Sequence, residues 1–327
     1  MSVPRSREVA SCRAVLWVVL LLLGGVTLSA AGEGSSSGIP ELIARLDDEL
    51  FTVRQGADQK LLELGKPALP ALLEATRSKS PEKRVRAAKL IRRIRARIIR
   101  GEFEEMGKLA DADLKVEHAM WAVALFLDPE LEKKAVTGAL DKMAVAVREK
   151  LGEEAEPKDR PPARAMAALV SVLKDQYGLV GDTMTYQDPD NSSMHRVIAR
   201  RKGLPILLSE IAVAVSRRLE LPVVGLGIPG RYMIKYDGRM APDGAPKKDI
   251  IINPFEGWRE TSVRELIMTV PGFDAGKHLL EFPARLTILR IMRNMENHAT
   301  VKGQQELVST ILDCYPLVAG PNVPLFR

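Results

Sequence analysis

Cysteine is nearly absent from this chain of 327 residues, which has only Cys12 and Cys314. Cys12 lies in an N-terminal segment that we expect to be removed, so the mature chain would keep one cysteine and no intramolecular disulfide. The four histidines are scattered without the spacing of metal ligands, and aromatic residues make up 5% of the chain. The stability of the fold must therefore come from aliphatic packing, and neither a metal site nor a cofactor is predicted.

The composition is otherwise typical of a soluble globular protein, with 46% apolar and 28% charged residues. The length is sufficient for two domains and a sizeable core. The formal net charge is +6 and the sequence pI is about 9.3. Such a charge favours nucleic acid or an anionic surface as a partner only where the positive residues are clustered.

The N-terminus has the pattern of an export signal. Three arginines precede an apolar run over residues 14–28, and small residues follow at 29–31. We expect cleavage after Ala31, a flexible Gly/Ser-rich leader over residues 32–38, and a periplasmic or secreted protein. Retention of the signal as a membrane anchor is the alternative, although the run is shorter than the ~20 residues of a comfortable span. Export argues against nucleic acid as a partner.

Residues 39–102 show the 3.6-residue apolar spacing of short paired helices. Gly65 is a helix stop, and Ser80 followed by Pro81 is a helix start. The segment resembles HEAT-type repeats, a protein-binding family of stacked helix pairs, in its sequences at 53–57, 64–70 and 85–88. About one and a half repeats are visible, so we expect these helices to pack on the next domain.

The most basic part of the chain is residues 77–100, with eleven Lys or Arg and one acidic residue. One interpretation is a contact with an anionic partner, such as membrane phospholipid or a wall polymer. The other is a solvated helix face beside an apolar stripe. The sequence leaves both open.

The middle of the chain predicts further helices and then an antiparallel sheet. Helices are expected through 103–151 and at 164–177, with a charged, proline-rich loop between them. Asn191 or Ser192 is expected to cap a helix at 193–201. A second helix at 205–219 carries a buried apolar stripe, with Glu210 expected on its outer face and a buried acid as the alternative. Strands are predicted at residues 223–228, 231–236 and 249–253, which makes the fold class α+β.

These elements and their motifs resemble the SirB-type branch of the transglutaminase-like superfamily. The matching motifs lie at residues 186–192, 200–206, 217–222, 229–232 and 252–255. The resemblance covers roughly residues 108–300 and implies a papain-type helix-plus-sheet core. We therefore assign residues 103–270 to this domain with its leading helices, and 271–327 to a helical tail. In that branch tetratricopeptide-like repeats follow the core, and residues 285–312 are a candidate remnant of one.

The resemblance also implies where catalytic residues would stand. Active members pair a cysteine at a helix start with a histidine base and an aspartate that orients it. The matching positions here are occupied by Pro205, Arg231 and Asn253. Arginine stays protonated near neutral pH and cannot act as a base. The loss of all three groups argues against acyl transfer through a thiol.

Three hypotheses remain for the function. In the first, a non-catalytic core holds a peptide or protein segment in its old cleft. The candidate cleft residues are Tyr186, His195, Ser209, Arg231, Tyr232, Asn253 and Trp258. In the second, Ser209 or His195 replaces the nucleophile of an envelope hydrolase or acyltransferase. In the third, the chain is an adaptor that uses residues 77–100 on an anionic membrane. Convergence of Ser209 or His195 on Arg231 would favour chemistry. A cleft filled by apolar side chains, including Leu204 and Phe255, would favour a scaffold.

Overall fold

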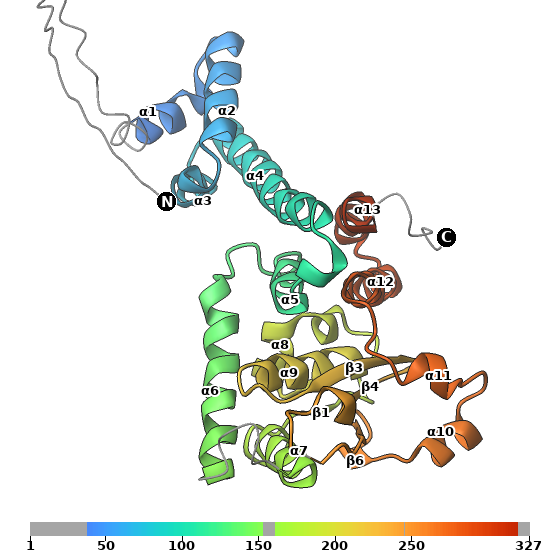
Figure 1. Cartoon of the computed structure of the whole chain (residues 1–327). Coiled ribbons are helices and arrows are strands. Elements are labelled where there is room, and N and C mark those ends of the chain that lie inside the picture. Colours follow the sequence, from blue (N-terminus) through green and yellow to red (C-terminus); the bar gives the residue numbers. More distant parts are fainter. Residues whose placement is uncertain (1–37, 153–160, 245, 320–327) are drawn as a thin grey trace, which may run out of the picture.

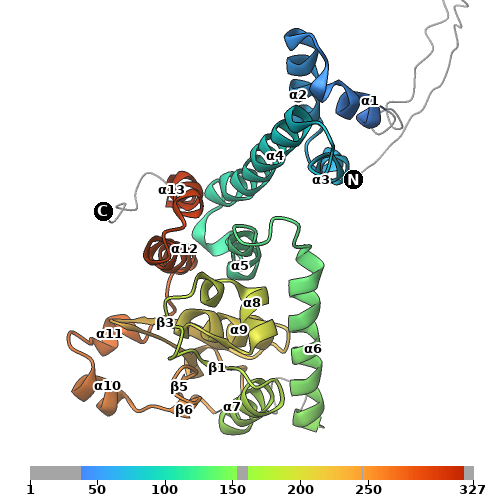
Figure 2. The same ribbon diagram turned by 180° about the vertical axis from the view of Figure 1, so that it is seen from behind.

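The computed structural model describes residues 38–152, 161–244 and 246–319 (Figures 1 and 2). The predicted export signal at residues 1–31 lies outside them. Within the described ranges, no helix has both the length and the apolar character needed to cross a membrane. The molecule has an N-terminal helical arm and a larger body that contains the sheet.

The arm consists of helices, as the apolar spacing predicts. Gly65 ends the second helix with a φ of 65°, and the Ser80 hydroxyl accepts a hydrogen bond from the Lys83 amide at 3.3 Å, so both boundary predictions are confirmed. The resemblance to HEAT-type repeats stays a prediction. The elements are α1 (Ile39–Ala44), the 3-10 turn Arg45–Asp47, α2 (Phe51–Leu64), the 3-10 turn Lys66–Ala68, α3 (Leu69–Ala75) and α4 (Pro81–Gly107).

Helix α4 connects the arm to the body because its two halves belong to different cores. Leu90 and Ile94 are buried against α1–α3, whereas Phe103 and Met106 are buried in the main core. The helix is continuous across the domain boundary that we predicted after residue 102. Its second half also packs against the C-terminal helix (Figure 1).

The helices of the body surround the central helix α9, in which residues 206–216 are all buried. Because α9 is covered on every side, the prediction that Glu210 lies on an outer face is wrong. The capping prediction at α8 is also wrong, since Asn191 Oδ1 and Ser192 Oγ accept no hydrogen bond from the described residues. The helices are α5 (Val116–Ala124), α6 (Lys133–Leu151), α7 (Pro162–Val170) with a π-helical turn Ser171–Gln176, α8 (Met194–Arg200) and α9 (Pro205–Arg217).

The sheet has four antiparallel strands in the order β3-β4-β5-β6. One face packs on α9 in the main core, and the other forms a small core that includes Leu266 and Val270. The α+β class and three of the strands are thus confirmed, while β6 and the short parallel pair β1-β2 were not predicted. The elements are β1 (Val180–Gly181), β2 (Lys202–Gly203), β3 (Val223–Ile228), β4 (Arg231–Tyr236), β5 (Ile250–Asn253), β6 (Arg259–Glu260), α10 (Val263–Thr269) and α11 (Ala275–His278).

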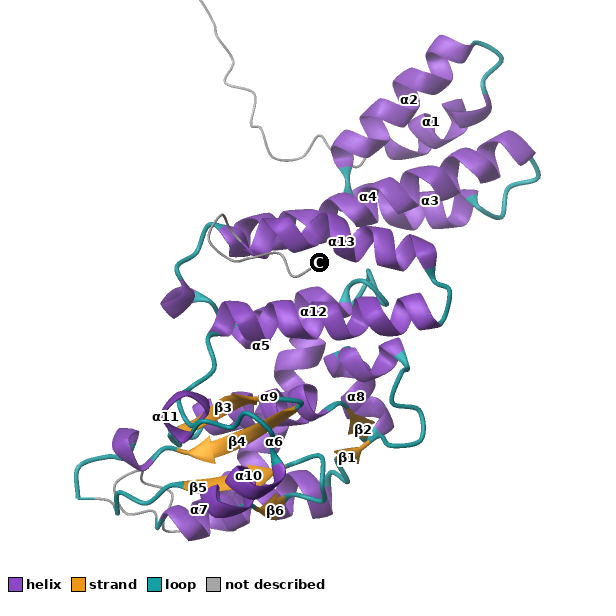
Figure 3. Ribbon diagram, turned by 90° about the vertical axis from the view of Figure 1, so that its right-hand side faces the viewer, coloured by secondary structure: helices purple, strands orange, loops and turns teal. Residues whose placement is uncertain are grey.

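The last two helices, α12 (Ala284–Val301) and α13 (Gln305–Ala319), close the body on the side of the arm (Figure 3). Helix α12 packs on α5 and on the 3-10 turn Pro189–Ser192, and α13 lies between α12 and α4. The described part of the C-terminal region is therefore mainly helical, as far as residue 319.

Candidate functional site

The three positions matched to a catalytic triad carry groups that do not support that chemistry. Pro205 is the first residue of α9, where the missing amide hydrogen of proline is tolerated. Arg231 begins β4, and its Nη1 lies 3.3 Å from Oε1 of Glu256, which follows β5. Asn253 ends β5 and accepts a hydrogen bond from the Glu256 amide at 3.3 Å. Arg231 and Asn253 therefore both contact Glu256, and neither is a base.

A buried polar network lies behind these positions, between α9, β4 and α12. The Tyr232 hydroxyl donates to Oε1 of Glu210 at 2.7 Å and lies 3.1 Å from the Thr287 hydroxyl. The absence of a side chain at Gly225 makes room for this hydrogen bond, because a Cβ there would come within 2.6 Å of the side-chain oxygens of both Tyr232 and Glu210. Burial raises the pKa of Glu210 to about 7, against the lowering effect of the Tyr232 hydrogen bond. Burial also raises the pKa of Tyr232 well above its usual value.

The two candidate replacement nucleophiles are engaged in other contacts. Ser209 is fully buried, and its hydroxyl donates to the Tyr232 carbonyl at 3.4 Å. His195 Nδ1 lies 3.0 Å from the Ser193 hydroxyl, and its Nε2 lies 3.6 Å from Asp128. Burial lowers the pKa of His195, and the nearby Arg196 lowers it further. Among the contacts of the described residues, Ser209, His195 and Arg231 do not meet one another.

The other residues predicted to line the cleft divide into exposed and buried ones. Tyr186 is exposed and lies edge-on to Phe255, with 5.9 Å between the ring centroids. Trp258 is 3% exposed and donates through Nε1 to the Leu179 carbonyl at 2.7 Å. Tyr232 and Asn253 are likewise buried, at 1% and 3%. Tyr232, Asn253 and Trp258 are therefore inside the molecule, whereas Tyr186 lines a shallow surface pocket together with its neighbours at residues 183–188.

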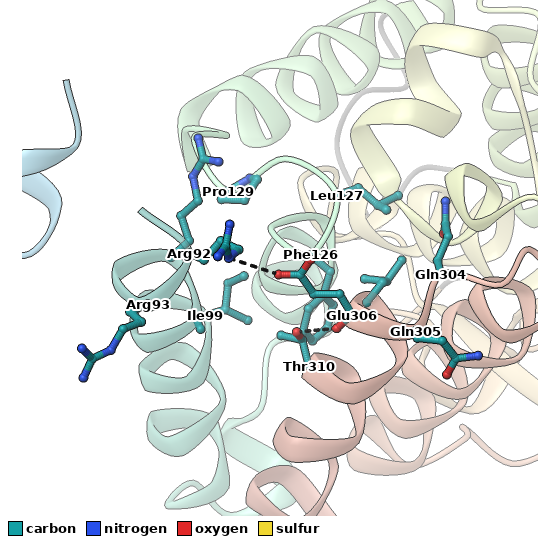
Figure 4. A pocket seen from close by; sticks show the side chains of 13 residues that line it. Arg92, Arg93, Ile99, Phe126, Leu127, Pro129, Gln304, Gln305, Glu306 and Thr310 are labelled. Carbon is teal, nitrogen blue, oxygen red and sulfur yellow. Dashed lines mark hydrogen bonds and ion pairs between the residues drawn. The ribbon is translucent and has the colours of Figure 1, made fainter. Parts of the chain in front are cut away.

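Two cavities of similar volume lie outside the matched positions, and neither was predicted from the sequence. The first, about 720 Å³, is the arm cavity between α4, the α5–α6 connection and the start of α13 (Figure 4). The second, about 700 Å³, is the hairpin cavity between residues 227–230 of the β3–β4 hairpin, residues 277–283, α12 and Tyr315. Both combine segments that are distant in sequence, so no local motif could have signalled them.

The basic segment 77–100 is largely engaged in contacts within the molecule. Lys83 pairs with Asp47 at 2.9 Å, and Arg86 pairs with Asp58 at 2.7 Å. Arg97 donates to a backbone carbonyl of α2. Figure 4 shows Arg92 directed toward the carboxylate of Glu306, an ion pair of 3.8 Å, and Arg93 directed away from it. These contacts fit the interpretation as an internally paired helix face better than that of a free anion-binding surface.

Cys314 lies in α13 and is buried, away from the matched positions. Burial raises the pKa of its thiol to about 12, with a further contribution from Asp313. A thiol with such a pKa is a poor nucleophile at neutral pH.

Comparisons with known proteins concern the same part of the chain. Residues 134–294, from within α6 to within α12, match the model of the transglutaminase-like superfamily. The chain carries a transglutaminase-like domain. The narrower assignment to the SirB-type branch stays a prediction. No solved structure matches the chain.

Relatives of the domain occur in bacteria and in animals. A UPF0162 protein of Xylella fastidiosa (strain 9a5c) is 32% identical over 141 residues, which cover 40% of this chain and 48% of that protein. A UPF0162 protein of Pseudomonas aeruginosa is 26% identical over 158 residues, which cover 48% of this chain and 53% of that protein. F-box only protein 21 of Mus musculus is 31% identical over 74 residues, 23% of this chain and 12% of that protein. The chain therefore spans about half the length of the bacterial relatives or less.

Proposed function

We propose that this chain is a non-catalytic transglutaminase-like protein that binds a peptide or a segment of another protein after export from the cytoplasm. The observation that carries the proposal is the replacement of all three triad groups by Pro205, Arg231 and Asn253, with the last two in contact with Glu256. A nucleophile without an adjacent base is weak at neutral pH.

The surroundings of the other candidate nucleophiles support the same conclusion. The Ser209 hydroxyl is buried and donates to a backbone carbonyl rather than to a base. The His195 ring is held by Ser193 at the start of α8, and the Cys314 thiol is buried in α13. The Ser193 hydroxyl does lie next to a base, His195, but Ser193 is fully buried, so none of these arrangements provides an accessible nucleophile.

The hairpin cavity supports binding as the retained role. Its volume of about 700 Å³ falls within the range of ligand pockets, roughly 300–1,000 Å³. It adjoins Arg231, because Gly230 and Arg231 are consecutive and Arg290, which lines the cavity, donates to the Arg231 carbonyl at 3.0 Å. A ligand in this cavity would lie beside the matched positions without requiring them to react.

Two measurements on the purified full chain test the proposal. Incubation with a glutamine peptide and a fluorescent amine should yield neither amine incorporation nor peptide hydrolysis above a protein-free control. An array of peptides, each blocked at both ends or left with free ends, should retain the chain at a subset of sequences. Turnover proportional to protein concentration, or an array with no bound sequence, would contradict the proposal.

Export is tested separately by mass spectrometry of the mature N-terminus. The proposal expects a chain that begins near Gly32, because the apolar run and residues 29–31 have the pattern of a cleaved signal. A mature chain that begins at Met1 and remains in the cytoplasm would contradict the export part and leave the binding part intact.

A further inference from the structure

The hairpin cavity is lined mainly by apolar side chains. Phe282, Leu286, Leu289 and Tyr315 contribute from the segment before α12, from α12 and from α13, and Leu280 contributes an exposed side chain. Burial of one large aliphatic side chain in such a cavity contributes a substantial part of a peptide's affinity. An apolar residue of a ligand therefore has a place to bind.

A strand edge borders the same cavity. β3 is the outer strand of the sheet, and the Gly225 carbonyl accepts a hydrogen bond from the Phe282 amide at 2.9 Å, so the Gly225 backbone groups point away from β4. Outward-pointing backbone groups recur at every second residue of an edge strand, which directs the amide and carbonyl of Gly227 to that edge too. Gly227 lines the cavity, and in the described part of the chain it makes no backbone hydrogen bond outside the sheet.

The unpaired edge at Gly227 is short, and the Phe282 ring packs on the side of Gly227 where a Cβ would stand, which favours the end of a polypeptide over a continuous strand. Phe282 occupies the edge at Gly225, and the turn at Pro229 and Gly230 ends the strand on the other side of Gly227. A peptide that paired with Gly227 and continued in the direction of Gly225 would collide with the segment that contains Phe282. A peptide that stops at Gly227 avoids this collision.

The charges around the cavity favour a carboxylate over an amine. Lys277, Arg290 and Arg293 line it together with one acid, Glu281, whose carboxylate is 3.7 Å from Arg217. The Arg290 guanidinium lies 5.5 Å from the centre of the Tyr232 ring and donates to the Arg231 carbonyl, and no carboxylate pairs with it among the described residues. Burial lowers the pKa of Arg290, which means that its charge is poorly solvated and would gain from an anionic partner.

We propose that the hairpin cavity binds the C-terminal end of an extended polypeptide. The last apolar side chain enters the cavity, the backbone pairs with Gly227 at the edge of β3, and the terminal carboxylate contacts Arg290. This site rests on the proposed binding function and gives its ligand class.

Fluorescence anisotropy with a labelled octapeptide tests the site. The probe is Gly-Ser-Gly-Ser-Gly-Ser-Val-Leu with a free C-terminal carboxylate, and its partner is the same peptide with a C-terminal amide. A third peptide, with Gly-Ser in place of Val-Leu, reports the contribution of the apolar side chain. The variants are Arg290→Met, Arg290→Lys and, as a matched control, Arg92→Met, which removes a guanidinium from the arm cavity of nearly equal volume.

We expect the peptide with the free carboxylate to bind at least about tenfold more tightly than the amide form. It should exceed the peptide that ends in Gly-Ser by a similar factor. Arg290→Met should remove the preference for acid over amide, Arg290→Lys should keep part of it, and Arg92→Met should keep all of it. If the native chain binds the acid and the amide equally well, the inference is overturned, and no variant is needed for that result. A preference that survives Arg290→Met in a chain with a native thermal melt, or that is lost on Arg92→Met, would overturn it as well.

The failure of this inference is separable from the failure of the proposed function. Retention of peptides that are blocked at both ends, together with no preference for the free acid, would refute the C-terminal site and leave peptide binding standing. Enzymatic turnover would refute the non-catalytic function whatever the anisotropy shows.

Discussion

Glu210 offers a quantitative test of the structure because it is 4% exposed and lies at the centre of the molecule. Its pKa is raised to about 7 by burial, from an ordinary value of 4.5. The hydrogen bond from Tyr232 and the charge of Arg217 lower the pKa, and the charge of Glu281 raises it. The folded state therefore holds a proton on Glu210 at pH values where the unfolded chain has already lost it.

The sign of the pH dependence follows from this difference. Below pH 4.5 the group is protonated in both states and costs nothing. As the pH rises from 4.5 to about 7, the free energy of unfolding falls, because the unfolded state binds fewer protons than the folded state. Above the folded-state pKa the loss is complete and amounts to roughly 3 kcal/mol at about 1.4 kcal/mol per pH unit. Glu210→Gln removes this loss and keeps an acceptor for the Tyr232 hydroxyl.

We expect Glu210→Gln to be close to the native chain in stability at pH 5 and more stable by up to roughly 3 kcal/mol at pH 8. Urea unfolding followed by circular dichroism at several pH values measures the difference, with Glu260→Gln, an exposed position on β6, as the control. A Glu210→Gln curve that stays parallel to the native curve from pH 5 to pH 8 would refute the buried, proton-holding glutamate.

Three further substitutions or treatments probe other parts of the site. Arg231→Ala should lower the free energy of unfolding by less than about 1 kcal/mol in a thermal melt, since its pair with Glu256 is partly exposed on both sides; a much larger loss would mean that Arg231 is a buried structural charge. Iodoacetamide at pH 8 should leave Cys314 unmodified until urea is added, because its pKa is about 12; rapid labelling of the folded chain, read by mass spectrometry, would contradict its burial. Trp258→Phe should cost about 1–3 kcal/mol in urea unfolding because it leaves the buried Leu179 carbonyl without its donor, and an unchanged midpoint would show that water replaces the indole.

Sequence patterns located the long elements of this fold because their signals are local. The β3–β4 hairpin was predicted with the correct bounds, since two apolar strands flank the turn at Pro229 and Gly230. Ser80 and Gly65 marked helix ends through hydrogen bonding and a positive φ, which depend only on neighbouring residues. Strand β6 has two charged residues and no apolar alternation, so its pairing with β5 had no sequence signal.

The candidate site was harder to predict because its contacts join distant segments. The sequence matched Pro205, Arg231 and Asn253 to the triad positions, but it did not indicate that Tyr232 and Trp258 are buried. Glu210 was expected at a helix surface, and only the packing of β4 and α12 around α9 places it next to Tyr232 and Thr287. The hairpin cavity likewise depends on where α12 lies relative to β3.

The central claim, binding without reaction, is tested most directly by a single experiment in the presence of a primary amine, with the labelled Val-Leu peptide carrying one glutamine in place of an internal serine, at saturating concentration. Anisotropy reports the complex, and mass spectrometry of the same sample after a day reports every peptide species. We expect a stable complex and the recovery of intact peptide only. Hydrolysed or amine-coupled peptide that increases with protein concentration and disappears in Ser209→Ala or His195→Ala would contradict it.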